Sequence, residues 1–172
     1  MIDGMAWGKK VSPTFKARVR WITDNLGCKP DELMSCIAWE SGETFSSNVK
    51  NAAGSGAVGL IQFMPSTAQG LGTSTQALAK LSPEDQLNYV YKYFKPHAGK
   101  LHNLGDLYMA ILWPAGIGKE DSYVLFDRTK TPTAYRQNKG LDVNKNGQVT
   151  RGECLVKIQQ KLAKGLTPQY FG

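Results

Sequence analysis

Apolar side chains recur at helical spacing in several stretches of the chain, and a proline stands at the start of three of them. Proline suits the first turn of a helix, because the backbone N–H groups there have no partner within the helix. These starts are Ser12-Pro13, Lys29-Pro30 and Ser82-Pro83. Each is followed by apolar positions that share one helical face, so three amphipathic helices are predicted.

Two further helices are predicted in the second half of the chain. The stretch from Gly105 to Trp113 is mostly apolar and is halted by Pro114, which is typical of a buried helix. A final amphipathic helix carries Leu155, Ile158 and Leu162 on one face. Only Gly56 to Phe63 shows a weak strand pattern, so the fold class is expected to be mainly α with minimal β.

A chain of 172 residues is long enough to bury one sizeable core, and we expect a single globular domain spanning residues 1–172. Residues 1–11 are expected to form a flexible N-terminal arm. Residues 128–172 are expected to form a C-terminal subregion packed on the same core, with a polar, turn-rich segment from Arg128 to Asn146.

The charge balance favours anionic partners. Lysine and arginine total 21 against 14 aspartates and glutamates, a formal net charge of +7, but the basic residues are scattered along the chain. No nucleic-acid docking motif is visible, so nucleic acid is not an expected partner, and attraction to anionic membranes should be weak at most. We expect no export signal and no membrane-spanning run in this sequence, and therefore a soluble protein made in the bacterial cytoplasm. A monomer is also expected.

Three cysteines, Cys28, Cys36 and Cys154, have no metal-like spacing and are expected to be free thiols. A bridge between Cys28 and Cys36 remains an open alternative at this stage.

Glu40 is the strongest candidate for acid chemistry. Cleavage of a glycosidic bond needs a carboxylic acid that is still protonated near neutral pH, and an apolar setting raises the pKa of a carboxyl group in that direction. Glu40 follows Ile37, Ala38 and Trp39 at the end of the second predicted helix and precedes the tight Ser41-Gly42 pair. Its carboxyl group is therefore expected at the edge of the core.

Two motifs carry a family resemblance: W-E-S-G from Trp39 to Gly42 and G-L-I-Q-F-M-P-S-T-A from Gly59 to Ala68. The pair resembles the soluble lytic transglycosylase and goose-type lysozyme families, where a glutamate-serine dipeptide ends a helix and a G-L-M-Q-type motif follows. The segment from Asn51 to Val58 resembles the phage-encoded branch of that superfamily, which includes endolysins. The resemblance implies a lysozyme-like fold and cleavage of peptidoglycan glycan strands.

Small residues make sense as a wall where a backbone must approach a sugar closely, and Gly54, Gly56, Ala57 and Gly59 are expected to form it. Ser55 is a further candidate for binding the substrate. Gln62 offers both a donor and an acceptor for a sugar substituent, and Phe63 offers a ring face. Ser41 is expected to support the carboxyl group of Glu40.

The chain departs from the family at a third motif, alanine-tyrosine-asparagine on a buried helix. That motif would fall near Leu112-Trp113-Pro114, where its polar residues are absent. In the family the tyrosine helps to orient the catalytic glutamate, and Trp113 offers only an indole N–H for that task. Tyr108 on the same helix and Tyr135 further along are alternative substitutes.

Many glycosidases use two carboxylates, but no convincing second one is visible. Glu43 is the only nearby candidate, and it is expected to be exposed. The resemblance implies instead one acid/base, assisted by the N-acetyl group of the substrate, which closes a 1,6-anhydro ring on the muramic acid product. Hydrolysis by the same acid is the alternative, because both reactions begin with protonation by Glu40.

A calcium-loop pattern begins at Asp142. The spacing matches D-x-[DN]-x-[DN]-G-x5-E and supplies oxygen ligands of the type that Ca²⁺ prefers. The ligands would be Asp142, Asn144, Asn146, the backbone carbonyl of Gln148, and Glu153. The alternative is an ordinary capping box at the start of the last helix, and the helix that should precede the loop is poorly supported. A structural calcium ion in an EF-hand-like loop at 142–153 is thus one of two interpretations, and no other cofactor is expected.

The sequence therefore predicts a muralytic enzyme that cleaves the β-1,4 bond between N-acetylmuramic acid and N-acetylglucosamine. A phage endolysin is the first expectation: it would reach the wall in the periplasm through a pore made by another protein. A virion-associated enzyme is second, and a non-catalytic glycan- or calcium-binding module is the rival from another class.

Overall fold

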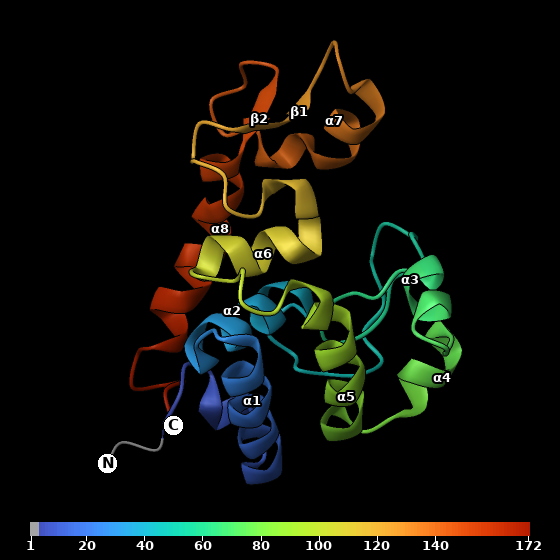
Figure 1. Ribbon diagram of the computed structural model, residues 1–172, viewed down its shortest axis with the longest axis vertical. Helices are drawn as coiled ribbons and strands as arrows, with labels where there is room; N and C mark the ends of the chain where they lie inside the picture. Colours follow the sequence, from blue (N-terminus) through green and yellow to red (C-terminus); the bar gives the residue numbers. More distant parts are fainter. Residues whose placement is uncertain (1–3) are drawn as a thin grey trace.

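The computed structural model describes residues 4–172, so residues 1–3 of the expected N-terminal arm lie outside the described residues. The described chain forms one mainly helical domain with a small two-stranded sheet (Figure 1). Its elements in chain order are η1 Gly8–Lys10, α1 Pro13–Leu26, α2 Pro30–Glu40, α3 Pro65–Gly70, α4 Thr75–Lys80, α5 Pro83–Phe94, η2 Lys95–His97, α6 Leu104–Leu112, η3 Pro114–Gly116, β1 Val124–Asp127, α7 Pro132–Asn138, η4 Lys139–Leu141, β2 Gln148–Thr150 and α8 Arg151–Gly165.

The predicted helix starts are confirmed, and side chains cap several of them. The Ser12 hydroxyl accepts the Phe15 N–H at 3.0 Å, and the Ser82 hydroxyl accepts the Asp85 N–H at 3.1 Å. These bonds satisfy backbone donors that the first turn of a helix leaves without a partner. Helix α2 begins with Pro30 as predicted, so the expected helices over the first half of the chain are present.

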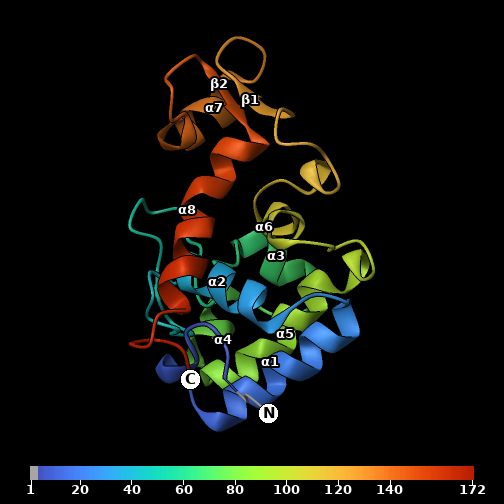
Figure 2. The same ribbon diagram turned by 90° about the vertical axis from the view of Figure 1, so that its left-hand side faces the viewer.

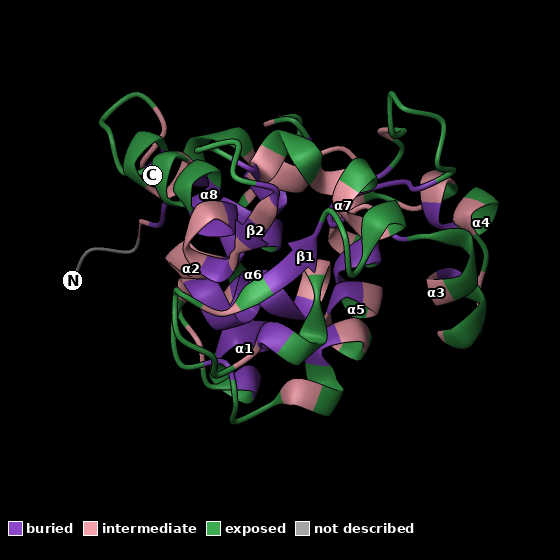
Figure 3. Ribbon diagram, turned by 90° about the horizontal axis from the view of Figure 1, so that it is seen from above, coloured by how far each residue is buried: buried purple, intermediate pink, exposed green. Residues whose placement is uncertain are grey.

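Helix α2 lies at the centre of the core. Its residues from Leu33 to Ala38 are all buried, and α1, α6 and α8 pack around it. Figure 3 shows buried residues gathered on α1, α2, α6 and the sheet, whereas α3 and α4 are mostly exposed or half-buried. The central position of α2 matters because the helix ends at Glu40.

The expected strand at 56–63 is wrong, and the sheet lies elsewhere. Residues 56–63 contribute only isolated bridges, between Lys50 and Val58 and between Val58 and Phe63. The reason is local: Gly59 and Gln62 have positive φ angles of 89° and 56°, which break the pleat of a strand. Strands β1 and β2 form an antiparallel pair in which Phe126 faces Val149.

The C-terminal subregion contains a helix that the polar pattern did not predict. Helix α7 begins at Pro132 in the segment expected to be turn-rich, and none of its residues is buried. It lies with β1 and β2 at one end of the molecule, and α8 runs from that end down along α2 (Figures 1 and 2). Because α7 buries no residue, its sequence needs no apolar face, and the helical spacing of apolar residues could not predict it.

The expected flexible arm is wrong for residues 4–11. Met5, Ala6 and Trp7 are buried, the Met5 N–H donates to the Gly172 carbonyl at 3.0 Å, and the Trp7 indole N–H donates to the Lys161 carbonyl at 3.0 Å. These residues therefore tie the start of the described chain to α8 and to the C-terminus.

All three cysteines are free, which removes the alternative of a Cys28–Cys36 bridge. Within residues 4–172, no helix has both the length and the apolar character needed to cross a bilayer.

Candidate active site

Glu40 is the last residue of α2, and its side chain is half-buried at the edge of the core. Within residues 4–172 its carboxyl group takes part in no hydrogen bond and no ion pair. Burial raises the pKa of Glu40 to about 8. At neutral pH the group is therefore mostly a neutral acid, which is the form that can donate a proton.

The turn after Glu40 is built by Ser41. Its hydroxyl donates to the Ile37 carbonyl at 2.7 Å and accepts the Phe45 N–H at 3.1 Å, and the residue is buried. Ser41 thus stabilises the turn at the helix end, and its hydroxyl bonds the backbone of Ile37 and Phe45 and not the carboxyl group of Glu40, which it was expected to support.

Glu43 is half-buried, where full exposure was expected, and it is paired. Its carboxylate accepts hydrogen bonds from Lys161 and from Lys164 of α8, the latter at 2.9 Å. Desolvation alone would raise the pKa of Glu43, but the hydrogen bonds from the two lysines lower it below its ordinary value. Glu43 is therefore an ionised group bound to α8, which does not suit a second acid.

The loop from Gly59 to Gln62 is held by a residue that the sequence analysis missed, Gln86 of α5. The buried Gln86 amide accepts the Leu60 N–H at 2.8 Å and donates to the carbonyls of Ser47 and Leu78, each at 2.9 Å. A side chain at Gly59 would collide with this amide. The available signal was a polar residue next to Leu87 on the apolar stripe of α5.

The side chains of Gln62 and Phe63, which were expected to contact a sugar, mainly make contacts within the protein. The Gln62 amide nitrogen donates to the carbonyls of Val49 and Gly59 at 3.1 and 3.0 Å, so its donors stabilise the loop. Phe63 is only 2% exposed and meets the Tyr93 ring edge-on, so it offers no ring face to a sugar. That expectation was wrong, because apolar burial took priority for Phe63. Ser55 is exposed, but it is not among the residues that line the cavity beside α4.

Tyr93 of α5 is a second residue that the sequence analysis missed. Its hydroxyl donates to the Ala110 carbonyl of α6 at 2.6 Å. Burial, and next the nearby charge of Glu40, raise the pKa of Tyr93 to about 12. Tyr93 also lines a small pocket of about 50 Å³ together with Gln62 and the exposed Met64. Tyr93 therefore lies both at this pocket and near the Glu40 carboxyl group.

The other aromatic candidates divide into two groups. Tyr108 is buried and its hydroxyl accepts the indole N–H of Trp39 at 3.0 Å, so it fixes the residue before Glu40 but does not reach a substrate. Trp113 is 37% exposed and packs edge-on against Phe126. Tyr135 donates to Asp142 at 2.6 Å and so belongs to the loop at 142–153, away from the groove.

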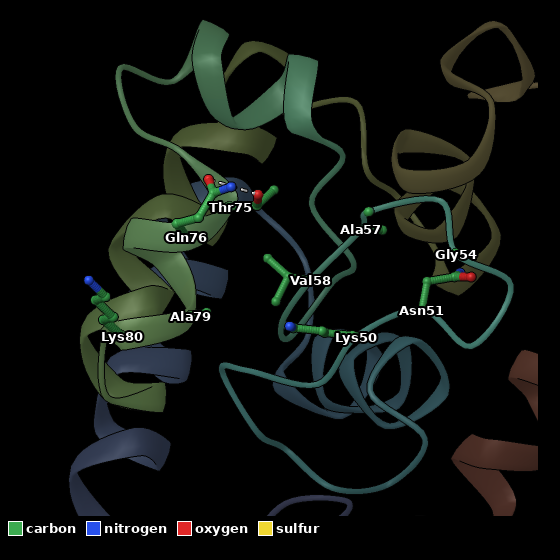
Figure 4. A pocket seen from close by; sticks show the side chains of 10 residues that line it. Lys50, Asn51, Gly54, Ala57, Val58, Thr75, Gln76, Ala79 and Lys80 are labelled. Atoms are coloured by element: carbon green, nitrogen blue, oxygen red, sulfur yellow. Dashed lines mark hydrogen bonds between the residues drawn. The ribbon is translucent and has the colours of Figure 1, made fainter.

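A sizeable cavity lies along the glycine-rich segment, and Glu40 is not among its lining residues. It has a volume of about 520 Å³, and Ala57 and Val58 face the α4 residues across it (Figure 4). Gly54 and Gly56 also line it. Lys50 and Lys80 are the charged residues of its lining. No carboxyl group is among the residues that line this cavity, so it holds no acid that could protonate a glycosidic oxygen.

The loop at 142–153 connects α7, through η4, to α8. Asp142 is buried, and its carboxylate accepts the backbone N–H groups of Asn146 and Gly147 at 3.2 and 2.9 Å. Glu153 accepts the N–H groups of Val143 and Thr150 at 2.8 and 3.1 Å. The capping box is present, and residues 4–172 contain no group of three histidine, cysteine, aspartate or glutamate side chains placed to hold a metal.

A mainly helical domain that presents one half-buried glutamic acid at the end of its central helix is a lysozyme-like fold. The chain matches the family model of the Transglycosylase SLT domain over residues 20–145, more than half of its length, and it belongs to this family. Members of the family are lytic transglycosylases that act on peptidoglycan and typically need no cofactor, so the family-level function is degradation of the cell wall. The match includes both Trp39–Gly42 and Gly59–Gln62.

Proposed function

We propose that this protein cleaves the β-1,4 bond between N-acetylmuramic acid and N-acetylglucosamine, with Glu40 as the acid and then the base. The observation that carries the proposal is the pKa of Glu40, which burial raises to about 8. A group with this pKa can both give and take a proton near neutral pH.

The proposed reaction needs no second carboxylate. Glu40 gives its proton to the glycosidic oxygen as the bond from that oxygen to C1 of the muramic sugar breaks, and the N-acetyl group of the same sugar stabilises C1. The Glu40 carboxylate then takes the proton of the C6 hydroxyl, whose oxygen bonds to C1 and closes the 1,6-anhydro ring. Two observations support this route. The Glu43 carboxylate forms ion pairs with Lys161 and Lys164, so it is not available as a second catalytic carboxylate. The pKa of Glu40 is raised by burial alone, without a second carboxylate.

We place the sugars in the groove between the end of α2 and the loop from Gly59 to Met64. Gln62 and the exposed Met64 line the small pocket beside Tyr93, and the Gln62 amide oxygen can accept a hydrogen bond because only the amide nitrogen bonds the loop. We place further sugars along the exposed Ser55 and the cavity that Gly54 and Gly56 line beside α4.

The test is the isosteric change Glu40→Gln. Turbidity clearing of purified sacculi should fall at least about a hundredfold, because an amide has no proton to give. Pelleting of the variant with sacculi should persist. Glu120→Gln, which removes an exposed carboxylate elsewhere, is the matched control and should clear sacculi like the parent. Clearing that survives Glu40→Gln would refute the assignment of the acid.

The products decide between transglycosylation and hydrolysis. Mass spectrometry of the released muropeptides should find anhydro ends, which are lighter than hydrolysed ends by one water. Hydrolysed ends alone would make the protein a lysozyme that uses the same acid.

As the biological role we propose a phage endolysin, in line with the resemblance of residues Asn51 to Val58 to that branch. Such an enzyme is made in the host cytoplasm and reaches the wall when another protein opens the membrane.

We also propose that the loop at 142–153 binds a structural Ca²⁺. The support is the combination of the full spacing pattern with a helix on each side, α7 and α8, the first of which the sequence did not predict. The hydrogen bond from Tyr135 lowers the pKa of Asp142, so this ligand is ionised at neutral pH. With only two charged ligands, we expect an affinity at the weaker end of the range for such loops.

Calcium-dependent melting tests the loop. Calcium at about a hundred times its Kd should stabilise the protein by about 2–3 kcal/mol, a rise of several degrees in Tm over the chelator-treated protein. Asp142→Ala should abolish the rise, whereas Asp24→Ala, an exposed change of the same charge, should keep it. Equal melting with calcium and with chelator would leave the capping box as the sole role of Glu153.

A further inference from the structure

A second surface, away from Glu40, combines an exposed tryptophan with basic side chains. Trp21 of α1 is 55% exposed, more than any other aromatic side chain in residues 4–172. Its ring meets the Tyr91 ring of α5 edge-on, with 4.9 Å between ring centroids. The two rings line a surface cavity of about 510 Å³ between α1 and α5, here named the Trp21 cavity.

The Trp21 cavity is separate from the candidate active site. Helices α1 and α5 lie side by side at the end of the molecule opposite α7 and the sheet (Figures 1 and 2). No residue of the Trp21 cavity lines the pocket beside Tyr93 or the cavity beside α4. A ligand in the Trp21 cavity therefore leaves the groove at Glu40 open.

Packing of α1 does not account for Trp21. The helix buries Phe15, Val19, Ile22 and Leu26 on its inner face, and Trp21 lies off that face. The exposed part of Trp21 contributes no burial to the fold, and tryptophan is enriched among the residues that dominate binding at protein interfaces.

The charges around Trp21 define the chemistry of a ligand. Every charged side chain that lines the Trp21 cavity is basic: Arg18, Lys92 and Lys95. Arg18 also pairs with the exposed Asp85 at 3.0 Å, so the two lysines, both exposed, are the main cations. A ligand that fits has an apolar face for the rings and carboxylates for the lysines.

We propose that the Trp21 cavity is a second binding site for peptidoglycan that takes the carboxylate-bearing peptide stems and adjoining sugars of strands not being cleaved. This inference rests on the proposed function, which makes peptidoglycan the substrate. The polymer has both features, because sugar C–H faces stack on tryptophan and the stems carry carboxylates. Since one insoluble polymer offers many repeats, a second contact raises the effective concentration of substrate at the groove.

The test measures binding without cleavage, in the Glu40→Gln background. Adding Trp21→Ala should weaken pelleting with sacculi by about five- to twentyfold, in line with the loss of an aromatic contact. Lys92→Gln with Lys95→Gln should weaken it in a salt-dependent way. The matched charge control is Lys139→Gln with Lys157→Gln, two exposed lysines elsewhere, which should bind like the parent. Trp21→Tyr should keep part of the affinity.

Two readouts keep this inference apart from the proposed function. In the active enzyme, the effect of Trp21→Ala should be confined to insoluble sacculi and absent on short soluble glycan fragments, which engage only the groove. Unchanged pelleting after Trp21→Ala, with the thermal melt intact, would overturn the second site alone. Clearing that survives Glu40→Gln would overturn the proposed catalysis alone.

A further experiment tests the alternative ligand of the Trp21 cavity, an anionic membrane surface. The same variants are mixed with vesicles of anionic phospholipid. Loss of vesicle binding with full retention of sacculus binding would assign the Trp21 cavity to a membrane surface and would also overturn the inference.

Discussion

The carboxyl group of Glu40 is mostly protonated at neutral pH because the last turn of α2 carries it to the edge of the core, where, within residues 4–172, it forms no ion pair. Glu43, three residues further along, shows the opposite outcome. Lys161 and Lys164 reach it from α8, and it is ionised. Two carboxyl groups in one short segment thus differ in protonation at neutral pH because their partners differ.

The raised pKa of Glu40 predicts how activity depends on pH. Proton donation requires the neutral acid, so kcat/KM on soluble glycan fragments should fall as pH rises through about 8, tenfold per pH unit well above that value. A pH series of initial rates measures the descending limb. A limb centred near the ordinary glutamate pKa would contradict the role of burial.

The same titration has a counterpart in stability. A group whose pKa is raised in the folded state favours folding below its unfolded pKa, and this contribution is lost as pH rises towards the folded value near 8. Glu40→Gln removes that titration. Allowing for the partial exposure of the side chain, the variant should be more stable than the parent at pH 8 by on the order of 2 kcal/mol, with little difference at pH 4. Urea denaturation at the two pH values measures this.

At the scale of elements, the sequence predicted what local chemistry determines. Proline and serine at Ser12-Pro13 and Ser82-Pro83 marked helix starts because capping acts within one turn, and the ends of α2 and α6 followed from Gly42 and Pro114. Helix α7 was missed because none of its residues is buried, so it left no apolar periodicity to read.

The candidate site was predicted only in part for a related reason. Glu40 and the loop from Gly59 to Gln62 were found because each lies within a short motif. Gln86 and Tyr93 were not, because their roles depend on contacts across the fold: Gln86 binds the backbone of Leu60, and Tyr93 lies near Glu40. Contacts between residues far apart in sequence leave no spacing rule in a single chain.

At the scale of the whole molecule, α8 connects the two ends of the domain. It begins in the loop at 142–153 and packs along α2, and its residues Lys161 and Lys164 bind Glu43, three residues after the end of α2. The family match ends at residue 145, yet α8 is integral to the core that supports Glu40. Residues 4–11, which the sequence suggested would be flexible, pack against the C-terminal end of α8, where the Trp7 indole N–H donates to the Lys161 carbonyl.

A buried ion pair connects the C-terminal subregion, residues 128–172, to the core. Arg151, the first residue of α8, bonds Asp106 of α6 at 2.8 Å and the carbonyl of Gly116 at 3.1 Å, and the side chains of Arg151 and Asp106 are 6% and 3% exposed. Removing one partner leaves a charge without compensation in the core. Arg151→Met should therefore lower the free energy of unfolding by about 3–5 kcal/mol in urea denaturation.

Adding Asp106→Asn to that variant should recover part of the loss, because no buried charge then remains. The recovery distinguishes an unpaired carboxylate from lost packing, since packing would not improve with the second change. A loss below 1 kcal/mol for Arg151→Met would mean that water reaches Asp106 in solution. In that case, residues 128–172 would move independently of α2. Calcium bound at 142–153 should then slow hydrogen exchange of the loop amides and leave the exchange of the α2 amides unchanged.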